Sequence, residues 1–323
     1  MNEKDISPIE YLTDKEQFRH KILFTGLDTA GKTSIILALK REFSNITKIE
    51  PTRGLRRENF ILLGHEISEW DLGGQKSYRI SYLKNPSKYF DRTEIAIYVI
   101  DIQNRDRLDE ALSYLNDVLE QFRGLRINPP LNIFFHKCDP MWIKSYPNEV
   151  RNLINDLSRK IQDLVNNQKI HFYQTSIFNF YSIMSAMSEV LLELFPKAQL
   201  IQKTIEDFAK KLNCEGIIII DDNSIILGSF FEHEEARFLL NKTMSYFLQL
   251  NDNFLEIGLN QLEDDKFLIQ KLGKYFVFRD ILIPGDPNPY HILLLSEYNP
   301  LNIFFNKKVF VSFIQILVDI INY

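Results

Sequence analysis

Between the first apolar run and the first amphipathic segment of the chain stands the octapeptide Gly26-Leu27-Asp28-Thr29-Ala30-Gly31-Lys32-Thr33. It fits the pattern G-x-x-x-x-G-K-[ST], whose glycines let backbone N–H groups curl around phosphates. Lys32 would reach the β and γ oxygens of a nucleotide, and the Thr33 hydroxyl would ligate Mg²⁺. The sequence therefore predicts a phosphate-binding loop whose nucleotide contacts are Gly26, Asp28, Thr29, Ala30, Gly31, Lys32, Thr33 and Ser34.

Around this loop, short apolar runs alternate with helix-length amphipathic segments, which is typical of βαβ units and a parallel sheet. The predicted strands are Lys21–Thr25, Phe60–Leu63, Glu66–Asp71, Ile95–Asp101, Leu131–His136 and Ile170–Gln174. The predicted helices are Thr33–Phe43, Arg107–Phe122, Glu149–Leu164 and Ser182–Leu194. We therefore expect an α/β domain with a mostly parallel six-stranded sheet over residues 19–196, preceded by an N-terminal extension at residues 1–18.

The pattern changes after Pro196, because proline blocks continuation of the preceding helix. Residues 197–323 are predicted to form a smaller α+β domain, one sheet with helices. Its predicted helices are Leu200–Leu212, Glu234–Leu250 and Leu301–Ile321, and its predicted strands are Gly216–Asp221, Ile225–Ser229, Leu255–Leu259, Phe267–Lys271, Tyr275–Arg279 and Ile292–Leu295. The terminal helix is apolar on more than one stripe, so burial inside its own domain and burial against a dimer partner both fit.

Length and composition agree with two globular domains. Of 323 residues, 45% are hydrophobic and 25% charged, which excludes disordered, collagen-like and membrane classes. The net charge of −5 argues against a nucleic-acid partner. Two cysteines favour a reducing compartment, and the polar, acidic N-terminus is unlike a signal peptide. Asn2 stands where myristoylation needs glycine. We therefore expect a cytoplasmic protein with no direct membrane anchor.

A second motif, Trp70-Asp71-Leu72-Gly73-Gly74-Gln75, ends the third predicted strand. Asp71 would hold Mg²⁺ through water, and the Gly74 N–H would meet the γ-phosphate. Gln75 would orient the attacking water. A plain strand-end turn is the alternative, because Gly-Gly is a turn dipeptide.

Thr52, in the segment Pro51-Thr52-Arg53-Gly54, can give its hydroxyl to Mg²⁺ and its N–H to the γ-phosphate. An ordinary loop threonine is the alternative. No arginine can be given the transition-state role from sequence, so we expect a partner to supply one in trans. The predicted catalytic residues are Gln75 and Lys32, and the predicted metal ligands are Thr33, Thr52 and Asp71.

A third motif, His136-Lys137-Cys138-Asp139, follows a six-residue apolar strand. An aspartate at its fourth place accepts hydrogen bonds from guanine N1–H and the 2-amino group, a donor pair that adenine lacks. Ser176 and Ile177, after the last strand, would contact the base from the other side. A strand-end K-x-D loop with a core histidine is the alternative reading. The order of the motifs favours a guanine site made by His136, Lys137, Asp139, Ser176 and Ile177.

The ordered set GLDTAGKT, PT-x-G, WDLGGQ, HKCD and TS resembles the Ras-superfamily GTPases. GLDTAGKT with WDLGGQ is similar to both the Arf and the Rag/Gtr branches. HKCD, where most members carry asparagine first, and the run FYQTSIFNFYSIMSAMSEVLLELFP resemble the Rag/Gtr branch. The element order predicted after Pro196 resembles the roadblock-type domain that Rag/Gtr proteins append. The resemblance covers the chain from Arg19 to Tyr323.

This resemblance implies a Rag-like switch that binds GTP and GDP with Mg²⁺, hydrolyses GTP slowly, and forms a homodimer or a heterodimer with a paralogue through its C-terminal domain. It also implies roadblock-domain proteins, GTPase-activating proteins and exchange proteins as partners, with peripheral membrane recruitment through them. His136 in place of asparagine lowers the expected guanine affinity. We expect the Asp28 carboxylate to slow turnover by repelling the γ-phosphate. An Arf-like monomeric trafficking GTPase and a non-hydrolysing nucleotide-bound scaffold are the alternatives.

Overall fold

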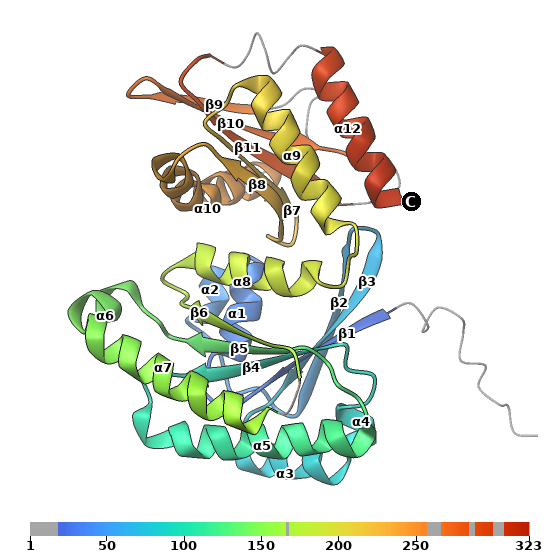
Figure 1. Ribbon diagram of the computed structural model, residues 1–323, viewed down its shortest axis with the longest axis vertical. Coiled ribbons are helices and arrows are strands. Elements are labelled where there is room, and N and C mark those ends of the chain that lie inside the picture. Colours follow the sequence, from blue (N-terminus) through green and yellow to red (C-terminus); the bar gives the residue numbers. More distant parts are fainter. Residues whose placement is uncertain (1–18, 166–167, 257–265, 284–287, 300–306, 323) are drawn as a thin grey trace, which may run out of the picture.

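The computed structural model of the chain describes residues 19–165, 168–256, 266–283, 288–299 and 307–322. It contains two sheets, and the first of them has six strands (Figure 1). The strand order is β2-β3-β1-β4-β5-β6. Only the β2–β3 pair is antiparallel among these five pairings. The mostly parallel six-stranded sheet is therefore confirmed. Its strands are β1 (Arg19–Thr25), β2 (Leu55–Leu62), β3 (His65–Leu72), β4 (Ile95–Asp101), β5 (Leu131–His136) and β6 (Ile170–Thr175).

Helices cover both faces of this sheet (Figure 1). On the face toward the second domain lie α1 (Lys32–Leu39), α2 (Phe43–Ile46) and α8 (Phe180–Leu192). On the other face lie α3 (Lys76–Lys84), α4 (Pro86–Tyr89), the 3-10 turn η2 (Arg105–Arg107), α5 (Leu108–Leu125), α6 (Pro140–Ser145) and α7 (Pro147–Leu164).

Two predicted helices end at clearly different residues: the one over Glu234–Leu250 continues to Glu256, and the one over Thr33–Phe43 is too long. The helix expected over Thr33–Phe43 stops at Leu39, because Arg41 has a φ of 58° and turns the chain before α2. The helices α3, α4 and α6 have no predicted counterpart, and α2 shares only Phe43 with a predicted helix.

Side chains of the central strands point alternately to the two faces of the sheet and so belong to two hydrophobic cores, one on each face. In β1, Ile22 and Phe24 pack with α1 and α8, whereas Leu23 packs with α5 and α7. In β4, Ile97 belongs to the first of these cores and Tyr98 to the second. Because both faces are buried, these strands read as continuous apolar runs, which is why the sequence pattern located them.

The second sheet is antiparallel, with the order β8-β7-β11-β10-β9. Helices α9 (Ala198–Leu212) and α12 (Lys307–Asn322) pack on one face and α10 (Glu234–Glu256) on the other (Figure 1). The predicted α+β domain is therefore confirmed. Its strands are β7 (Gly216–Asp221), β8 (Ile226–Phe231), β9 (Lys266–Lys271), β10 (Lys274–Ile281) and β11 (Tyr290–Ser296).

The strand predicted over Leu255–Leu259 is wrong where it can be compared: Leu255 and Glu256 form the last turn of α10, and residues 257–259 lie outside the described residues. Residues 301–306 of the predicted terminal helix and the N-terminal extension at 1–18 also lie outside them. Within α12, Phe313 is buried and its ring stacks on Phe208 of α9 at a centroid distance of 3.9 Å. The domain therefore buries one stripe of its own terminal helix.

The predicted boundary after Pro196 falls between α8 and α9, yet the two domains share a core. Ile183 of α8 belongs to the cluster under the first sheet, and Met184, the next residue, packs with α10. Arg41, two residues after the end of α1, donates hydrogen bonds to Asp252 at 2.6 and 2.9 Å and to the Asp222 backbone oxygen at 2.8 Å. A cut after Pro196 would therefore expose the second face of α8.

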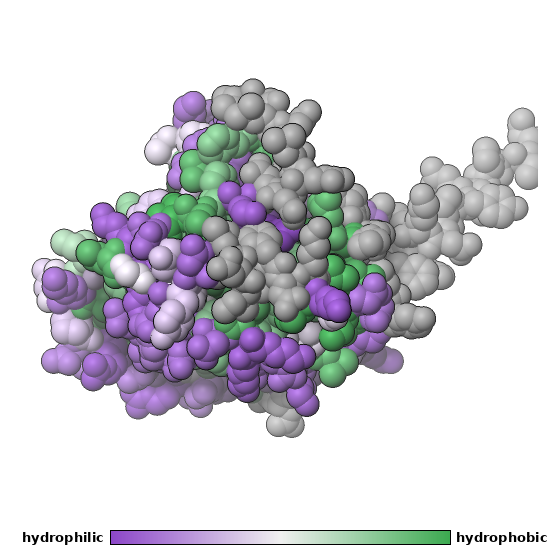
Figure 2. All heavy atoms as spheres, turned by 90° about the horizontal axis from the view of Figure 1, so that it is seen from above, coloured by the Kyte–Doolittle hydropathy of each residue, from purple (hydrophilic) through white to green (hydrophobic). Residues whose placement is uncertain are grey.

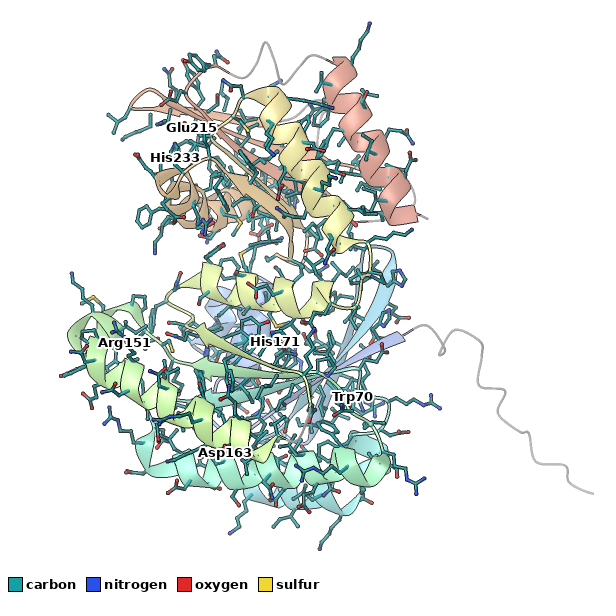
Figure 3. All side chains as sticks on the ribbon, viewed as in Figure 1. Trp70, Arg151, Asp163, His171, Glu215 and His233 are labelled. Atoms are coloured by element: carbon teal, nitrogen blue, oxygen red, sulfur yellow. The ribbon has the colours of Figure 1, made fainter. Side chains whose placement is uncertain are left out.

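Two histidines of the second domain, for which the sequence indicates no site, are held by carboxylates. His233 Nε2 lies 3.0 Å from Glu215 Oε1, and Figure 3 shows the two side chains close together. His291, almost fully buried, has Nδ1 2.6 Å from Asp280 Oδ1. These contacts tie β11 and the start of α10 to neighbouring strands. In the ranges that the structure describes, no helix is long and apolar enough to cross a membrane.

Candidate nucleotide site

The predicted phosphate loop joins β1 to α1 at the carboxyl end of the parallel strands. β1 lies between β3 and β4, the position where open α/β sheets bind ligands. Gly26 has a φ of 135° and Gly31 a φ of 100°, which favour glycine. A Cβ atom on Gly26 would lie 2.4 Å from the Val99 oxygen, and one on Gly31 2.4 Å from His136 Cδ2. Close packing under the loop therefore requires both glycines.

The three predicted metal ligands converge. The Thr33 hydroxyl donates to Asp71 Oδ2 at 2.7 Å and lies 2.9 Å from the Thr52 hydroxyl, although the three residues come from separate elements. Asp71 Oδ1 is buried and has no hydrogen-bond partner among the described residues. Burial raises the pKa of Asp71, against the opposing charge of Lys32 and the threonine hydrogen bonds. An all-oxygen set with one unused carboxylate oxygen fits a hard cation such as Mg²⁺.

Lys32 lies at the bottom of the loop. Its ammonium donates to the backbone oxygens of Leu27 at 2.8 Å and Gly26 at 3.1 Å. Burial lowers its pKa to about 8, and the carboxylates of Asp71 and Asp28 oppose that shift. Among the described residues, the ammonium donates hydrogen bonds to its own loop alone, and it can exchange these carbonyls for phosphate oxygens.

Two glycines let the segment after β3 approach its neighbours closely: Gly73 approaches Thr52 in the loop before β2, and Gly74 approaches the phosphate loop. A Cβ on Gly73 would lie 2.4 Å from the Thr52 oxygen, and one on Gly74 2.0 Å from the Asp28 nitrogen. Gln75 immediately precedes α3 and lines the same cavity as Lys32. The structure therefore places the predicted water-orienting residue beside the predicted phosphate loop.

The predicted base residues also meet. Asp139 Oδ1 accepts a hydrogen bond from the Ser176 hydroxyl at 2.6 Å. The Lys137 ammonium pairs with Asp101 Oδ2 at 2.6 Å, which directs the lysine stem along the loop. His136 Nδ1 lies 2.9 Å from the Thr175 hydroxyl. Burial, then the charge of Lys137, lowers the pKa of His136 to about 3, so the imidazole is neutral and braces Gly31 by packing.

Two further residues reach the site from the segment between β4 and α5. Gln103 Nε2 donates to Asp139 Oδ2 and to the Lys137 backbone oxygen, both at 2.8 Å. Arg107 Nη2 donates to Asp28 Oδ1 at 2.8 Å. Neither residue belongs to a motif, so neither was predicted from the sequence. The one signal available was their place after the carboxyl end of a predicted parallel strand.

A cavity of about 260 Å³ joins the phosphate side to the base side. Four predicted residues do not line this cavity. Ala30 packs into the core, whereas Gly26, Asp71 and Ser176 each form a hydrogen bond with a residue that lines it. Phe178, largely exposed, also reaches the cavity from the loop after β6. The predicted residues that line the cavity are Asp28, Thr29, Gly31, Lys32, Thr33, Ser34, Thr52, Gly74, Gln75, His136, Lys137, Asp139 and Ile177.

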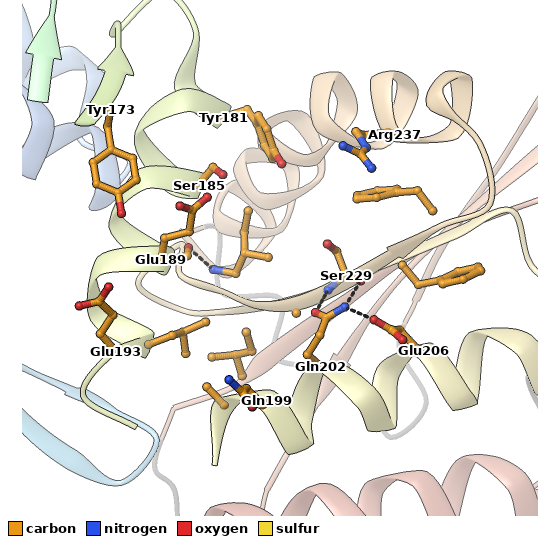
Figure 4. Close-up of a pocket in the computed structure, with 18 of the residues that line it drawn as sticks. Tyr173, Tyr181, Ser185, Glu189, Glu193, Gln199, Gln202, Glu206, Ser229 and Arg237 are labelled. Atoms are coloured by element: carbon orange, nitrogen blue, oxygen red, sulfur yellow. Dashed lines mark hydrogen bonds between the residues drawn. The ribbon is translucent and has the colours of Figure 1, made fainter. Parts of the chain in front are cut away.

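A larger cavity of about 1040 Å³ lies between α8, α9 and the edge strand β8 (Figure 4). Gln202 covers the strand edge, donating to the Ser229 oxygen at 2.7 Å and accepting from its nitrogen at 3.0 Å. The Ser188 hydroxyl accepts from the Ile226 nitrogen at 2.7 Å. Side chains thus satisfy backbone groups that would otherwise pair with another strand. Among the described residues, no predicted site residue lines this cavity.

Comparison with known proteins identifies the family. The Gtr1/RagA G protein conserved region matches residues 21–247, more than two-thirds of the chain. The chain belongs to the Gtr1/RagA family of G proteins. The match extends through β8 and most of α10, so it includes part of the second domain.

The chain is also similar to Arf-like proteins. It is 40% identical over 125 residues to ADP-ribosylation factor-like protein 3 of Chlamydomonas reinhardtii, covering 39% of this chain and 66% of that protein. It is 35% identical over 109 residues to ADP-ribosylation factor-like protein 2 of Arabidopsis thaliana, covering 34% of this chain and 56% of that protein. The chain therefore spans less than two-thirds of either relative. The Arl6 BBS3 small GTPase of Trypanosoma brucei, solved with GppNp, matches at a TM-score of 0.44 with 20% identity, over 54% of this chain and 96% of that one.

Proposed function

We propose that the chain is a Rag-like molecular switch that binds GTP and GDP with Mg²⁺ and hydrolyses GTP slowly. The convergence of Thr33, Thr52 and Asp71 beside the phosphate loop carries this proposal. Thr52 lies in the loop before β2 and Asp71 near the end of β3, so one ligand would tie both segments to α1. Loss of the γ-phosphate would remove this connection and release both segments, which is how such loops act as switches.

Each residue of the site has a definite task in this proposal. Lys32 stabilises charge on the β and γ oxygens, and Gln75 orients water for attack. Thr33, Thr52 and Asp71 would hold Mg²⁺, which would supply positive charge against the phosphates. Asp139 accepts from the guanine N–H donors while Gln103 and Ser176 fix its carboxylate. An arginine that stabilises the charge of the transition state would come from a partner protein, in trans.

The first experiment is displacement of a fluorescent GDP by GTP, GDP and ATP, with Mg²⁺ or with EDTA. We expect GTP and GDP to compete at least about 100-fold better than ATP, because adenine leaves Asp139 unpaired. We expect EDTA to speed nucleotide release by about tenfold or more, since a metal bound by Asp71 links protein and phosphates. Equal competition by ATP would contradict the guanine site. Phosphate release with time separates a GTPase from the non-hydrolysing scaffold, which releases none.

We further propose that the second domain dimerises with a second copy or a paralogous chain through α10 and β9. β9 stands at the edge of its sheet, and Phe238 and Tyr246, eight residues apart on α10, are exposed. Figure 2 looks onto the end of the molecule that the second domain forms and shows hydrophobic residues among hydrophilic ones. A strand edge next to apolar side chains favours pairing with a like surface. The exposed apolar residues of these two elements are Phe238, Tyr246, Phe254, Leu255, Leu268 and Ile269.

Light scattering on the full chain, with GDP and with a non-hydrolysable GTP analogue, tests this interface. We expect twice the chain mass of 38.1 kDa in both states. Phe238→Glu combined with Ile269→Lys should return the mass to that of a monomer, because charges would face the apolar patch. Met141→Lys, an exposed apolar site on α6, is the matched control and should stay dimeric. A wild-type monomer would contradict the homodimer and favour the heterodimer with a paralogous chain. Peripheral membrane recruitment through roadblock-type partners belongs to the same proposal and is supported by family membership alone.

A further inference from the structure

An arginine pairs with the phosphate loop from outside every motif. Arg107 Nη2 donates to Asp28 Oδ1 at 2.8 Å, and Nη1 lies 3.5 Å from the Asp28 backbone oxygen. Both side chains are about one-third exposed, and Asp28 lines the nucleotide cavity, so the pair lies at the surface beside that cavity rather than in the core. The contact therefore places a cation on the one acidic residue of the octapeptide.

Asp28 lies on the side of the site where a γ-phosphate is expected. Its backbone nitrogen would be 2.0 Å from a Cβ on Gly74, the residue whose N–H is proposed to meet the γ-phosphate. Its carboxylate also acts on the Lys32 ammonium, which reaches the β and γ oxygens in the proposed function. A free carboxylate at this point would repel a triphosphate more than a diphosphate.

Arg107 is itself held in place. Its Nε donates to Glu110 Oε2 at 2.9 Å, and Glu110 also pairs with Arg79 of α3, the helix that begins one residue after Gln75. Arg79 is buried, with its guanidinium 5.0 Å from the centre of the Tyr114 ring. The hydrogen bonds from Arg107 and then Arg79 lower the pKa of Glu110. The chain Asp28–Arg107–Glu110–Arg79 thus connects the phosphate loop to α3.

We propose that Arg107 is a positioning residue that sets the preference for GTP over GDP, by holding the Asp28 carboxylate away from the γ-phosphate and offsetting its charge. The proposal rests on the proposed nucleotide function and deepens it. It also modifies the expectation that Asp28 slows turnover by repulsion, because the charge of Asp28 is paired in the structure. Without Arg107, the same carboxylate is free to repel a γ-phosphate.

The test compares GTP and GDP affinities of the full chain with Mg²⁺. In Arg107→Ala we expect GTP affinity to fall by roughly 10- to 100-fold and GDP affinity by less than about threefold, the scale of one uncompensated like charge. Adding Asp28→Asn to that variant should restore the GTP to GDP ratio, because the repelling charge is gone. Arg105→Ala is the matched control: Arg105 lies on the same 3-10 turn, is exposed and pairs with Glu149. It should leave the ratio unchanged.

The outcomes separate the two proposals. A wild-type chain that binds neither nucleotide would overturn the proposed function itself. A wild-type chain that binds both, with equal losses of GTP and GDP affinity in Arg107→Ala, would show that Arg107 only maintains the loop and would overturn this inference. Failure of Asp28→Asn to restore the ratio would also overturn it, because the effect would not then pass through the Asp28 charge.

Discussion

A Gln75→Leu chain is expected to bind GTP and GDP within about threefold of wild type while its single-turnover GTP hydrolysis falls by roughly 100- to 1000-fold, the usual contribution of a residue that positions a reacting group. The reason is geometric. Gln75 lines the nucleotide cavity at the start of α3, but none of the motif contacts that build the phosphate loop uses its side chain. Leucine has a similar length and cannot hold a water molecule by hydrogen bonds. Single-turnover phosphate release and nucleotide affinity, measured side by side, check both halves of this expectation.

Gln121→Leu is the matched control for Gln75→Leu. Gln121 lies on α5, and its amide donates within its own helix, to the Asp117 oxygen at 3.3 Å. The control should hydrolyse GTP at the wild-type rate. Equal rates for Gln75→Leu and wild type would remove Gln75 from the mechanism. A parallel loss of nucleotide affinity would instead mean that Gln75 supports the shape of the site.

Burial explains which strands and helices could be predicted. β4 and β5 are buried on both faces and read as apolar runs, so their predicted bounds match the structure. β2 lies at the sheet edge and its first half is largely exposed, so only its apolar end was predicted. In α3, only Arg79 and Tyr82 are buried, which leaves no apolar stripe to detect. The false strand arose because apolar residues stand at every second position from Leu255 to Leu259, a pattern that begins in the last turn of α10.

The candidate site contains residues that the sequence motifs predicted and residues that no motif contains. Residues within the motifs were predicted because neighbours in sequence share one loop, and the structure brings Thr33, Thr52 and Asp71 together as expected. The contact between Arg107 and Asp28 joins residues 79 positions apart, and that between Gln103 and Asp139 joins residues 36 apart. Such pairs depend on how β4 and β5 lie beside β1, and a single sequence does not encode them as a local pattern.

Asp139→Asn is expected to lower GTP and GDP affinity by about 100- to 1000-fold, because a site built to pair with polar groups rejects the wrong donor pattern strongly. The asparagine amide places an N–H where the guanine 2-amino group also donates. Xanthine carries a carbonyl at that position, so xanthine nucleotides should bind the variant better than guanine nucleotides do. Displacement of a fluorescent xanthine nucleotide and of a fluorescent guanine nucleotide from each protein measures both effects.

The partners of Asp139 decide how this result is interpreted. Gln103 donates to one carboxylate oxygen and Ser176 to the other, and each oxygen keeps a lone pair for the base. Ser176→Ala should therefore weaken guanine binding by about tenfold, the value of one hydrogen bond to a charged group, without favouring xanthine. Asp156→Asn, an exposed carboxylate on α7, should change neither. Guanine affinity that survives Asp139→Asn would place base selection elsewhere in the cavity, whereas loss without a gain for xanthine would mean that the amide disrupts the Gln103 contact and closes the base site.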